Sequence, residues 1–401
     1  MADWGMSFGT ISRNGEKFPS EGTDYITSLR PIFSGQIKDS FALLSDIKFD
    51  YHKGDIFYDL FSEKHNISYE NSEHVFSTDG YSIFKLPWFK LLLGKDKIKW
   101  GPGYHGQLML SSNPESANMM KLDFEFKNIR FQSFTSKLLS ELGNKYMSAH
   151  RIEFLLFDRL DLGLSETLVF GNEFAIEYLN PFQLFAISEG ITESYSGKAN
   201  LLESVDLSCR IVDGLQIYGE LAVDEARLLV KPLNHWDTIF GILGGFYIAD
   251  PFSIDDTDLR VEYAFTNQYF YTYHQPLPNY SHLDSSIGHW MGTDADDLWC
   301  EIKHRFTDRF QTALSYELER HGEGDMDTPH PTGKGFDDGR WTFLSGVNEY
   351  KHSFGINVSY RKIGGYLLGM EYTRSYMKNL DNKRGENGKG NQLTFEISYW
   401  Y

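Results

Sequence analysis

The chain has 401 residues, a formal net charge of −18, an aromatic content of 16% and a mean hydropathy of −0.40. The acidic balance excludes a nucleic-acid-binding protein, which needs a basic surface. The sequence contains no apolar run long enough for a membrane-spanning helix. Abundant aromatic residues with a polar average instead indicate a transmembrane β-barrel, because half of each strand faces lipid and half faces water.

Strand-like segments with a period of two begin near 24–36 and recur to the end of the chain. Leu122, Phe124 and Phe126, for example, alternate with charged residues. A charge at every second position suits a hydrated lumen and does not suit the second face of a buried sheet. Further segments of this kind lie at 205–212, 298–303, 310–319, 354–361, 366–373 and 392–401.

The connections between these segments fall into two classes, which is typical of outer-membrane barrels. A turn near 349–351 would place the long connection 320–340 on the wrong rim, so either this turn is misread or a short strand lies within 321–339. The segment 188–202 alternates poorly and predicts a short helix in the lumen or at a rim. Short turns are predicted at 157–161, 212–214, 306–309 and 363–365, and long polar connections at 63–80, 190–200, 272–297, 320–340 and 377–391.

The last segment, 392–401, has the clearest pattern. Leu393, Phe395, Ile397, Tyr399 and Tyr401 share one face, and ten residues is the length that a tilted strand needs to cross a bilayer. Its terminal aromatic residue resembles the signal that the barrel-assembly machinery reads. The alternative, an edge strand of a soluble sandwich, would leave clustered aromatic residues without a partner.

Several motifs carry a family resemblance. The stretch 93–114 reads L-G-K-D-K-I-K-W-G-P-G-Y-H-G-Q-L-M-L-S-S-N-P, and similar matches occur at 178–181, 214–220 and 287–294. Together these stretches resemble the Wzi family of capsule-assembly outer-membrane proteins. The resemblance implies a monomeric transmembrane antiparallel barrel of about 18 strands (16–18), all-β, with a lumen partly occluded by loops or short helices.

The resemblance also implies a function. We expect one domain over 1–401 in the outer membrane of a Gram-negative-type bacterium, surrounded by lipid, that binds and anchors extracellular or capsular polysaccharide without catalysis. The start of the chain carries no signal peptide, so this interpretation requires that the signal was removed or left out. A strand as early as 24–36 predicts no helical bundle before the barrel. The alternatives are a porin for small solutes and a structural barrel within a larger envelope complex.

Two groups of residues are candidates for polysaccharide contact. Trp100, Gly101, Pro102 and Gly103 form a predicted tight turn, and a planar aromatic residue on a rigid turn can stack on a sugar ring. Tyr104 and His105 follow directly, and His289 and Trp290 lie in a later loop. The alternative is a structural role, in which Trp100 anchors the chain at the membrane interface and the glycines shape a fold in the lumen.

Other candidate sites are weaker. Tyr269, Tyr271 and Tyr273 are expected in an interfacial aromatic girdle in preference to a sugar site. A loop with His321, Asp325, Asp327, His330, Asp337 and Asp338 matches no EF-hand and no zinc signature. Cys209 and Cys300 are expected to be unpaired and unreactive. We therefore predict no catalytic residues, no metal and no cofactor.

Overall fold

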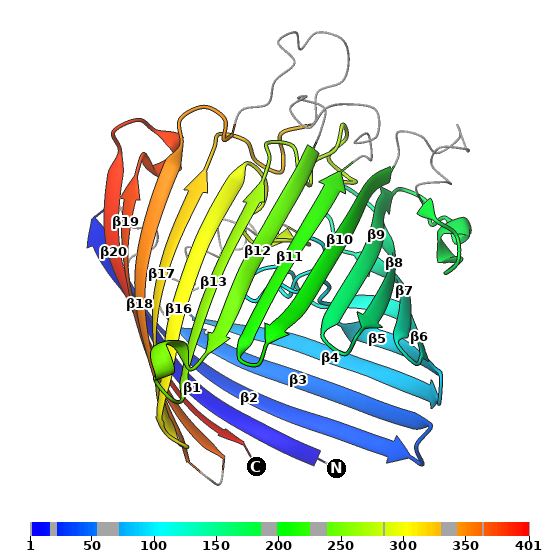
Figure 1. The fold of residues 1–401 in the computed structure, drawn as a ribbon, viewed down its shortest axis with the longest axis horizontal. Helices are drawn as coiled ribbons and strands as arrows, with labels where there is room; N and C mark the ends of the chain where they lie inside the picture. Colours follow the sequence, from blue (N-terminus) through cyan, green and yellow to red (C-terminus); the bar gives the residue numbers. More distant parts are fainter. Residues whose placement is uncertain are drawn as a thin grey trace.

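The structure is a computed structural model that describes residues 2–16, 22–53, 72–185, 199–224, 239–283, 285–329, 343–362 and 365–400. Within them, an antiparallel sheet of 18 strands closes on itself, because β1 (Ala2–Glu16) pairs with both β2 (Gly22–Ile37) and β20 (Asn387–Trp400) (Figure 1). The predicted all-β barrel is therefore confirmed.

Around the barrel each strand pairs with its neighbours in the chain, except where a hairpin of β14 (Ser281–His282) and β15 (Ser285–Ser286) intervenes. The remaining barrel strands are β3 (Phe41–Lys53), β4 (Ser72–Leu86), β5 (Phe89–Asp96), β6 (Ala117–Phe126), β7 (Ile129–Leu138), β8 (Lys145–Leu156), β9 (Leu160–Gly171), β10 (Ala199–Val212), β11 (Leu215–Asp224), β12 (Ile239–Ala249), β13 (Thr257–Thr266), β16 (Ala295–Thr307), β17 (Phe310–His321), β18 (Glu349–Lys362) and β19 (Tyr366–Lys378). Three short 3-10 helices also occur: η1 (Ile176–Leu179), η2 (Pro251–Ser253) and η3 (Leu380–Asn382).

The two faces of the sheet differ as the alternation predicts. On β20, Phe395 and Ile397 are 44% and 51% exposed, whereas the neighbouring Ser398 is buried. Ile397 lies opposite Leu368 of β19, another exposed apolar side chain. An apolar outer face and a polar inner face are the arrangement of a membrane-spanning barrel. Among the helices of the described ranges, none is long and apolar enough to cross a membrane.

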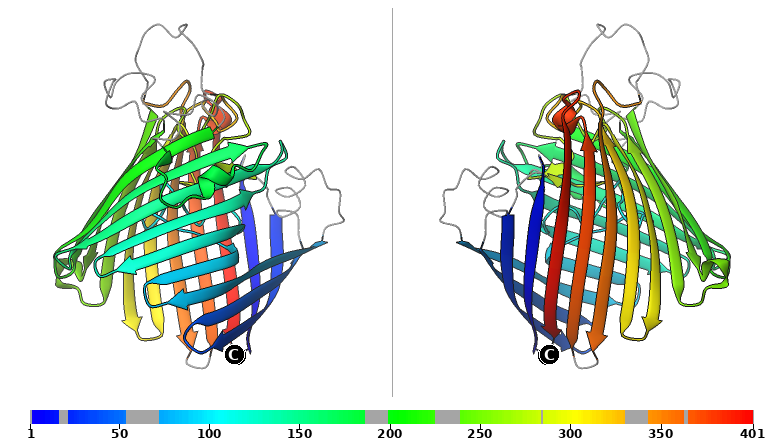
Figure 2. Two further views of the ribbon diagram at one scale, coloured as in Figure 1. Left: turned by 90° about the vertical axis from the view of Figure 1, so that its right-hand side faces the viewer. Right: turned by 90° about the vertical axis from the view of Figure 1, so that its left-hand side faces the viewer.

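The two rims differ in the length of their connections (Figure 2). Both chain ends lie at the rim of the short turns, such as 127–128 and 213–214, and long connections such as 267–294 lie at the opposite rim. This asymmetry is typical of outer-membrane barrels, in which short turns are periplasmic and long loops extracellular. We call the two ends the short-turn end and the long-loop end.

The structure differs from the predicted strands, turns and loops in four details. The expected turn at 349–351 lies inside β18, so it was misread, and 322–348 is a long-loop connection of which 330–342 lies outside the described residues. β4 begins at Ser72, inside the expected loop 63–80, of which 63–71 is not described. β1 was missed. In the expected helix 188–202, only 199–202 is described, and it belongs to β10.

Two long-loop connections, 97–116 and 267–294, fold into the lumen. We call them together the plug. Their buried residues, which include Leu108, Met109, Tyr271 and Tyr280, form one hydrophobic core with inward side chains of the wall. The wall residues of this core come from β7 to β13 and β16, so the plug packs against one side of the barrel. The expectation of a partly occluded lumen is met in this way.

A third connection packs on the outside of the barrel. Residues 172–185, which include η1, lie against the outer face of β7, β8 and β9, where Figures 1 and 2 show η1 beyond the barrel wall. Phe185 is buried and lies flat on His150, with ring centroids 4.3 Å apart. His150 pairs with Glu166 at 2.9 Å, and the Glu166 carboxylate also accepts the backbone N–H of Phe185. The segment thereby covers a hydrogen-bonded pair of polar side chains on the outer wall.

Candidate functional site

Two carboxylates of the barrel wall hold the first plug segment. Glu262 of β13 accepts the backbone N–H groups of Tyr104, His105 and Gly106 at 2.6, 3.0 and 2.9 Å. Glu220 of β11 accepts those of Leu108 and Met109 at 3.0 and 3.1 Å. These five backbone N–H groups lie in irregular structure and do not pair in a β-ladder, so the wall carboxylates satisfy them instead.

The second plug segment holds the first from the other side. The hydroxyl of Tyr271 donates to the carbonyl oxygen of Leu108 at 2.6 Å, and that of Tyr280 donates to the carbonyl oxygen of Met109 at 2.8 Å. Burial raises the pKa of both tyrosines, which keeps each hydroxyl proton in place for donation. The tyrosine-rich stretch 269–273 therefore lies in the plug, and the expected interfacial girdle is wrong for it.

The close approach of the two segments requires glycine at position 106. A Cβ atom added there would lie 2.1 Å from Nε2 of His289. His289 is itself fully buried, and this burial lowers its pKa to about 3. The imidazole is consequently neutral at physiological pH.

The structure separates the candidate sugar-contacting residues into buried and accessible ones. Trp100 is only 3% exposed and meets Phe134 edge to face at 5.3 Å, inside the plug core and away from the membrane interface. Trp100 and His289 thus have no open ring face, and Gly103 is buried beside them. Gly101, Pro102, His105 and Trp290 are half-buried and Tyr104 is 46% exposed.

The accessible aromatic residues gather around a side chain that the sequence did not single out. Trp299 of β16 stacks on His105, with ring centroids 4.9 Å apart and planes at 9°, and also contacts Tyr104 at 5.4 Å. The edge of Trp290 meets His105 at 5.5 Å. The guanidinium of Arg260 lies over the Tyr104 ring, 3.9 Å from its centroid. These five residues, Tyr104, His105, Arg260, Trp290 and Trp299, form what we call the aromatic cluster.

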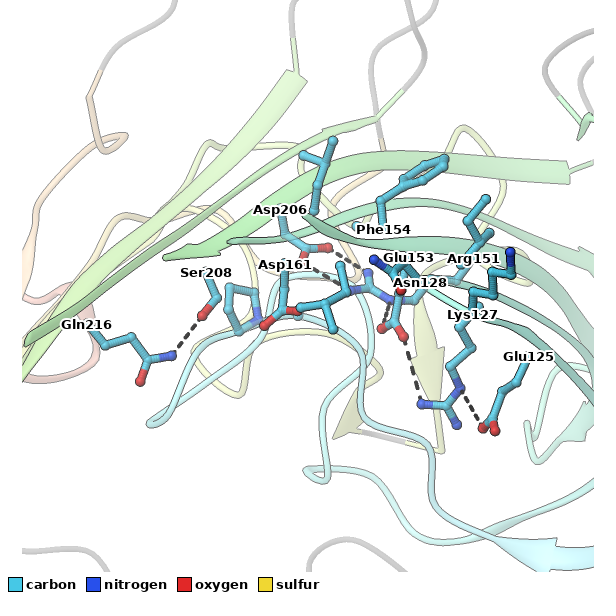
Figure 3. A pocket seen from close by; sticks show the side chains of 17 residues that line it. Glu125, Lys127, Asn128, Arg151, Glu153, Phe154, Asp161, Asp206, Ser208 and Gln216 are labelled. Atoms are coloured by element: carbon cyan, nitrogen blue, oxygen red, sulfur yellow. Dashed lines mark hydrogen bonds and ion pairs between the residues drawn. The ribbon is translucent and has the colours of Figure 1, made fainter. Parts of the chain in front are cut away.

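The underside of the plug borders two polar cavities near the short-turn end. A cavity of about 430 Å³ runs from Gly101 and Pro102 to the turn residues Lys127 and Asn128 (Figure 3). In it Arg151 forms a two-point ion pair with Asp206, at 2.5 and 3.0 Å. A second cavity of about 230 Å³ extends from Tyr104 and Trp299 to lumenal polar residues, namely Glu301, Lys303, Gln311, Ser315, Asn357 and Glu371.

Sequence reasoning missed Arg151, Asp206 and Trp299 as site residues. Each falls on the polar face of an alternating strand, and many such residues face the lumen without lining a site. Two features of the fold place these three residues in a site. One is the register between strands, which sets Arg151 opposite Ser165, and the other is the position of the plug. No local signal in the sequence carries that information.

Of the residues weighed for metal binding, Asp325 and Asp327 are exposed in a loop, as expected, and His321 is the last residue of β17. His321 pairs with Glu319 of its own strand at 2.7 Å, and Asp325 accepts hydrogen bonds from Asp327 and Thr328, while 330, 337 and 338 lie outside the described residues. A different group, His105, Asp297 and Glu317, brings its ligand atoms within 4.8 Å of one another. Cys209 and Cys300 are both free thiols.

Comparison with known proteins identifies relatives at the level of a family and of the fold. A family model described as capsule assembly protein Wzi matches residues 16–392. The outer-membrane protein Wzi of Escherichia coli, described as a carbohydrate-binding β-barrel involved in group 1 capsule assembly, superposes with a TM-score of 0.64 at 14% identity, covering 98% of this chain and 84% of that one.

Barrels of Pseudomonas aeruginosa are also similar in fold. OccK3 (OpdO) superposes with a TM-score of 0.54 at 10% identity, covering 100% of this chain and 95% of that one. OprD gives a TM-score of 0.53 at 10% identity, covering 100% and 94%. No curated protein sequence matches this chain.

Proposed function

This chain belongs to the Wzi family of capsule assembly proteins, and from that premise we propose that it is a non-catalytic outer-membrane barrel that binds extracellular or capsular polysaccharide. The apolar outer face and the difference between the two rims support a place in the outer membrane. The description of the Escherichia coli relative as carbohydrate-binding supports the ligand class.

The observation that carries the proposal is the fixed plug. Five backbone N–H groups of the segment 97–116 donate to Glu220 and Glu262, and two buried tyrosines hold the same segment from the opposite side. A plug with this many internal hydrogen bonds is a rigid platform. Rigid, preorganised side chains are what a binding protein needs and a wide solute pore does not.

We propose the aromatic cluster, with Gly101 and Pro102 beside it, as the sugar-contacting surface within the lumen. Exposed aromatic rings can stack on sugars, and the neighbouring polar side chains can bind hydroxyl groups. Trp100, Gly103 and His289 act beneath this surface as its support. Because Tyr104 and Trp299 line a cavity that extends toward the short-turn end, the cluster would contact a glycan segment that enters the barrel.

The sheet also bears on the oligomeric state of the protein and on its recognition by the barrel-assembly machinery. Since β1 and β20 pair, the described sheet has no open edge that a second copy must cover, which supports a monomer in lipid. β20 presents Phe395, Ile397 and Tyr399 outward, and we propose that this strand is what the barrel-assembly machinery recognises.

A deletion strain tests the proposed function in the cell. We expect loss of cell-associated polysaccharide with release of polymer into the medium, restored by the wild-type gene. Restoration should fail with a Tyr104→Ala, Trp290→Ala double variant that reaches the outer membrane in normal amount. Unchanged retention of polysaccharide in the deletion strain would contradict the proposal.

A solute channel is the second candidate, and one observation favours it. The core formed with the plug includes no described residue of β1–β5 or β17–β20, and glycine and serine residues such as Gly9 and Ser398 face inward there. Planar-bilayer recordings separate the two functions. Large steady currents would support the channel, and near-silent membranes would support the binding protein.

A further inference from the structure

Three side chains from three different elements converge at the edge of the plug. His105 belongs to the plug, Asp297 to β16 and Glu317 to β17. Nε2 of His105 lies 3.0 Å from Oε1 of Glu317 and 3.7 Å from Oδ2 of Asp297. One ligand atom from each residue lies within 4.8 Å of the other two, which is the spacing of ligands around one metal ion.

The charges around this group do not balance. Two nearby carboxylates have basic partners, because Asp296 pairs with Arg320 and Glu319 pairs with Lys351 and His321. A third, Glu262, accepts backbone N–H groups of the plug. In the described part of the protein, the only basic group that pairs with Asp297 or Glu317 is the His105 imidazole.

Asp297 gives an independent indication of a ligand. Its side chain is only 3% exposed, and its Oδ1 atom is buried with no hydrogen-bond partner among the described residues. A buried carboxylate oxygen without a donor is costly. The same carboxylate supplies one of the three converging oxygen and nitrogen atoms, so a cation bound there would satisfy it.

The imidazole is held in the orientation that a metal ligand needs. Its ring stacks on Trp299 at 9° and makes a T-shaped contact with Trp290, so two aromatic side chains constrain its orientation. The backbone N–H of the same residue donates to Glu262, which fixes the main chain. This support sets the Nε2 atom toward the two carboxylates without further rearrangement.

We propose that His105, Asp297 and Glu317 bind one divalent transition-metal ion, for which Zn²⁺ is the best match. One imidazole nitrogen with two carboxylates is a donor set that Zn²⁺ accepts in three-ligand sites that keep a further position open. Ca²⁺ requires six or more oxygen ligands, and Mg²⁺ prefers oxygen alone. The side chains of His105 and Glu317 are 24% and 21% exposed, so the open position faces the lumen.

Such an ion would extend the attachment of the plug along the wall. The carboxylates of β11 and β13 already hold the segment 97–116, and the metal would add an attachment to β16, the neighbour of β13, and to β17. His105 belongs to both the metal group and the aromatic cluster. Zn²⁺ binding is measured without polysaccharide, however, so the two proposals can fail separately.

The test uses the full chain without a polyhistidine tag, refolded in a neutral detergent free of lipopolysaccharide and stripped with EDTA. Isothermal titration with ZnCl₂ should give one site per barrel, and elemental analysis after gel filtration should give the same stoichiometry. Asp297→Asn and His105→Gln should each weaken the affinity at least about tenfold. His321→Gln, which removes a histidine paired with a different wall carboxylate, should bind Zn²⁺ like the wild type.

A spectroscopic measurement covers the case in which the variants do not fold. X-ray absorption of the Zn²⁺-loaded wild-type protein should show a first shell of nitrogen and oxygen with one imidazole and no sulfur. The proposal is overturned if the wild type binds no Zn²⁺ in the titration. It is also overturned if folded Asp297→Asn protein binds with wild-type stoichiometry and affinity, which would indicate adventitious binding only.

Discussion

Glu262 accepts the backbone N–H of His105 at 3.0 Å, although the two residues are separated by 157 positions in the chain. The same carboxylate accepts the neighbouring N–H groups of Tyr104 and Gly106 and the hydroxyl of Tyr218. One wall residue thus anchors the tip of the plug, and the positions of the candidate site residues depend on it.

Replacing Glu262 should loosen the plug. Glu262→Gln removes the negative charge and one acceptor oxygen, so the donors that it serves lose charge-assisted hydrogen bonds. We expect a loss of about 2–3 kcal/mol in the free energy of unfolding, measured by urea titration in detergent micelles. Glu371→Gln changes an exposed lumenal carboxylate that accepts none of the plug hydrogen bonds described above, and it should leave stability near the wild-type value. Equal stability of both variants would refute the anchoring role.

Gly106→Ala should destabilise the plug by overpacking. The added methyl group would lie 2.1 Å from His289, which has no room to move because it is fully buried. We expect a cost of about 1–3 kcal/mol, read as a lower thermal midpoint on a gel-shift assay. Gly35→Ala is the matched control, because its Cβ would meet nothing within 4 Å. A midpoint for Gly106→Ala equal to that of the control would count against the packing seen here.

The stability of the plug should depend on pH through His289. Its folded pKa of about 3 lies below the ordinary value of 6.5, so the unfolded chain binds more protons between these two pH values. Stability is therefore complete above pH 6.5 and falls as the pH decreases toward 3. The loss between pH 7 and pH 4.5 should be about 2 kcal/mol.

The comparison of two variants isolates this effect from other titrating groups. His289→Gln should flatten the decrease in unfolding free energy between pH 7 and pH 4.5 by the stated amount. His274→Gln, at a half-buried loop position, should retain the wild-type slope. An unchanged slope in His289→Gln would mean that this imidazole is not buried in the neutral form.

The outer segment should protect the hydrogen-bonded pair of His150 and Glu166 from lipid. Phe185→Ala would uncover His150 and Glu166 and leave a cavity, with an expected cost of about 3–5 kcal/mol for unfolding from lipid vesicles. Phe182→Ala, on the same segment but 76% exposed, should cost only about 1 kcal/mol through its contact with Phe131. Similar costs for the two variants would argue that the segment does not cover the pair.

The barrel itself could be predicted because its signal is local. In β20 every second residue is apolar over ten positions. The pairing with β1 and β19 sets these residues beside the outward residues of both neighbours, so the pattern of each strand is enough to predict the outer face. In β1 the apolar outer residues Met6 and Phe8 alternate with Gly5, Ser7 and Gly9, and these three inner residues carry no charge of the kind that marked the lumenal face of the other strands. Glu349 and Lys351 suggested a turn, yet they are polar residues at the start of β18.

The plug could not be predicted in the same way, because its contacts are non-local. Nothing near Tyr271 indicates that its hydroxyl meets the carbonyl oxygen of Leu108, 163 positions away. The motif at 100–103 correctly marked a special turn, but only the fold shows that Trp100 is covered by Phe134 while Tyr104 remains exposed. Burial of a loop residue is decided by the walls around it.

Binding of purified polysaccharide tests the central claim most directly. The wild-type barrel in lipid nanodiscs should bind fluorescently labelled capsular polysaccharide from the producing strain, saturably and in competition with unlabelled polymer. The Tyr104→Ala, Trp290→Ala double variant should bind at least about tenfold more weakly. Absence of saturable binding by folded wild-type protein, together with large steady currents in planar bilayers, would contradict the account and favour a channel.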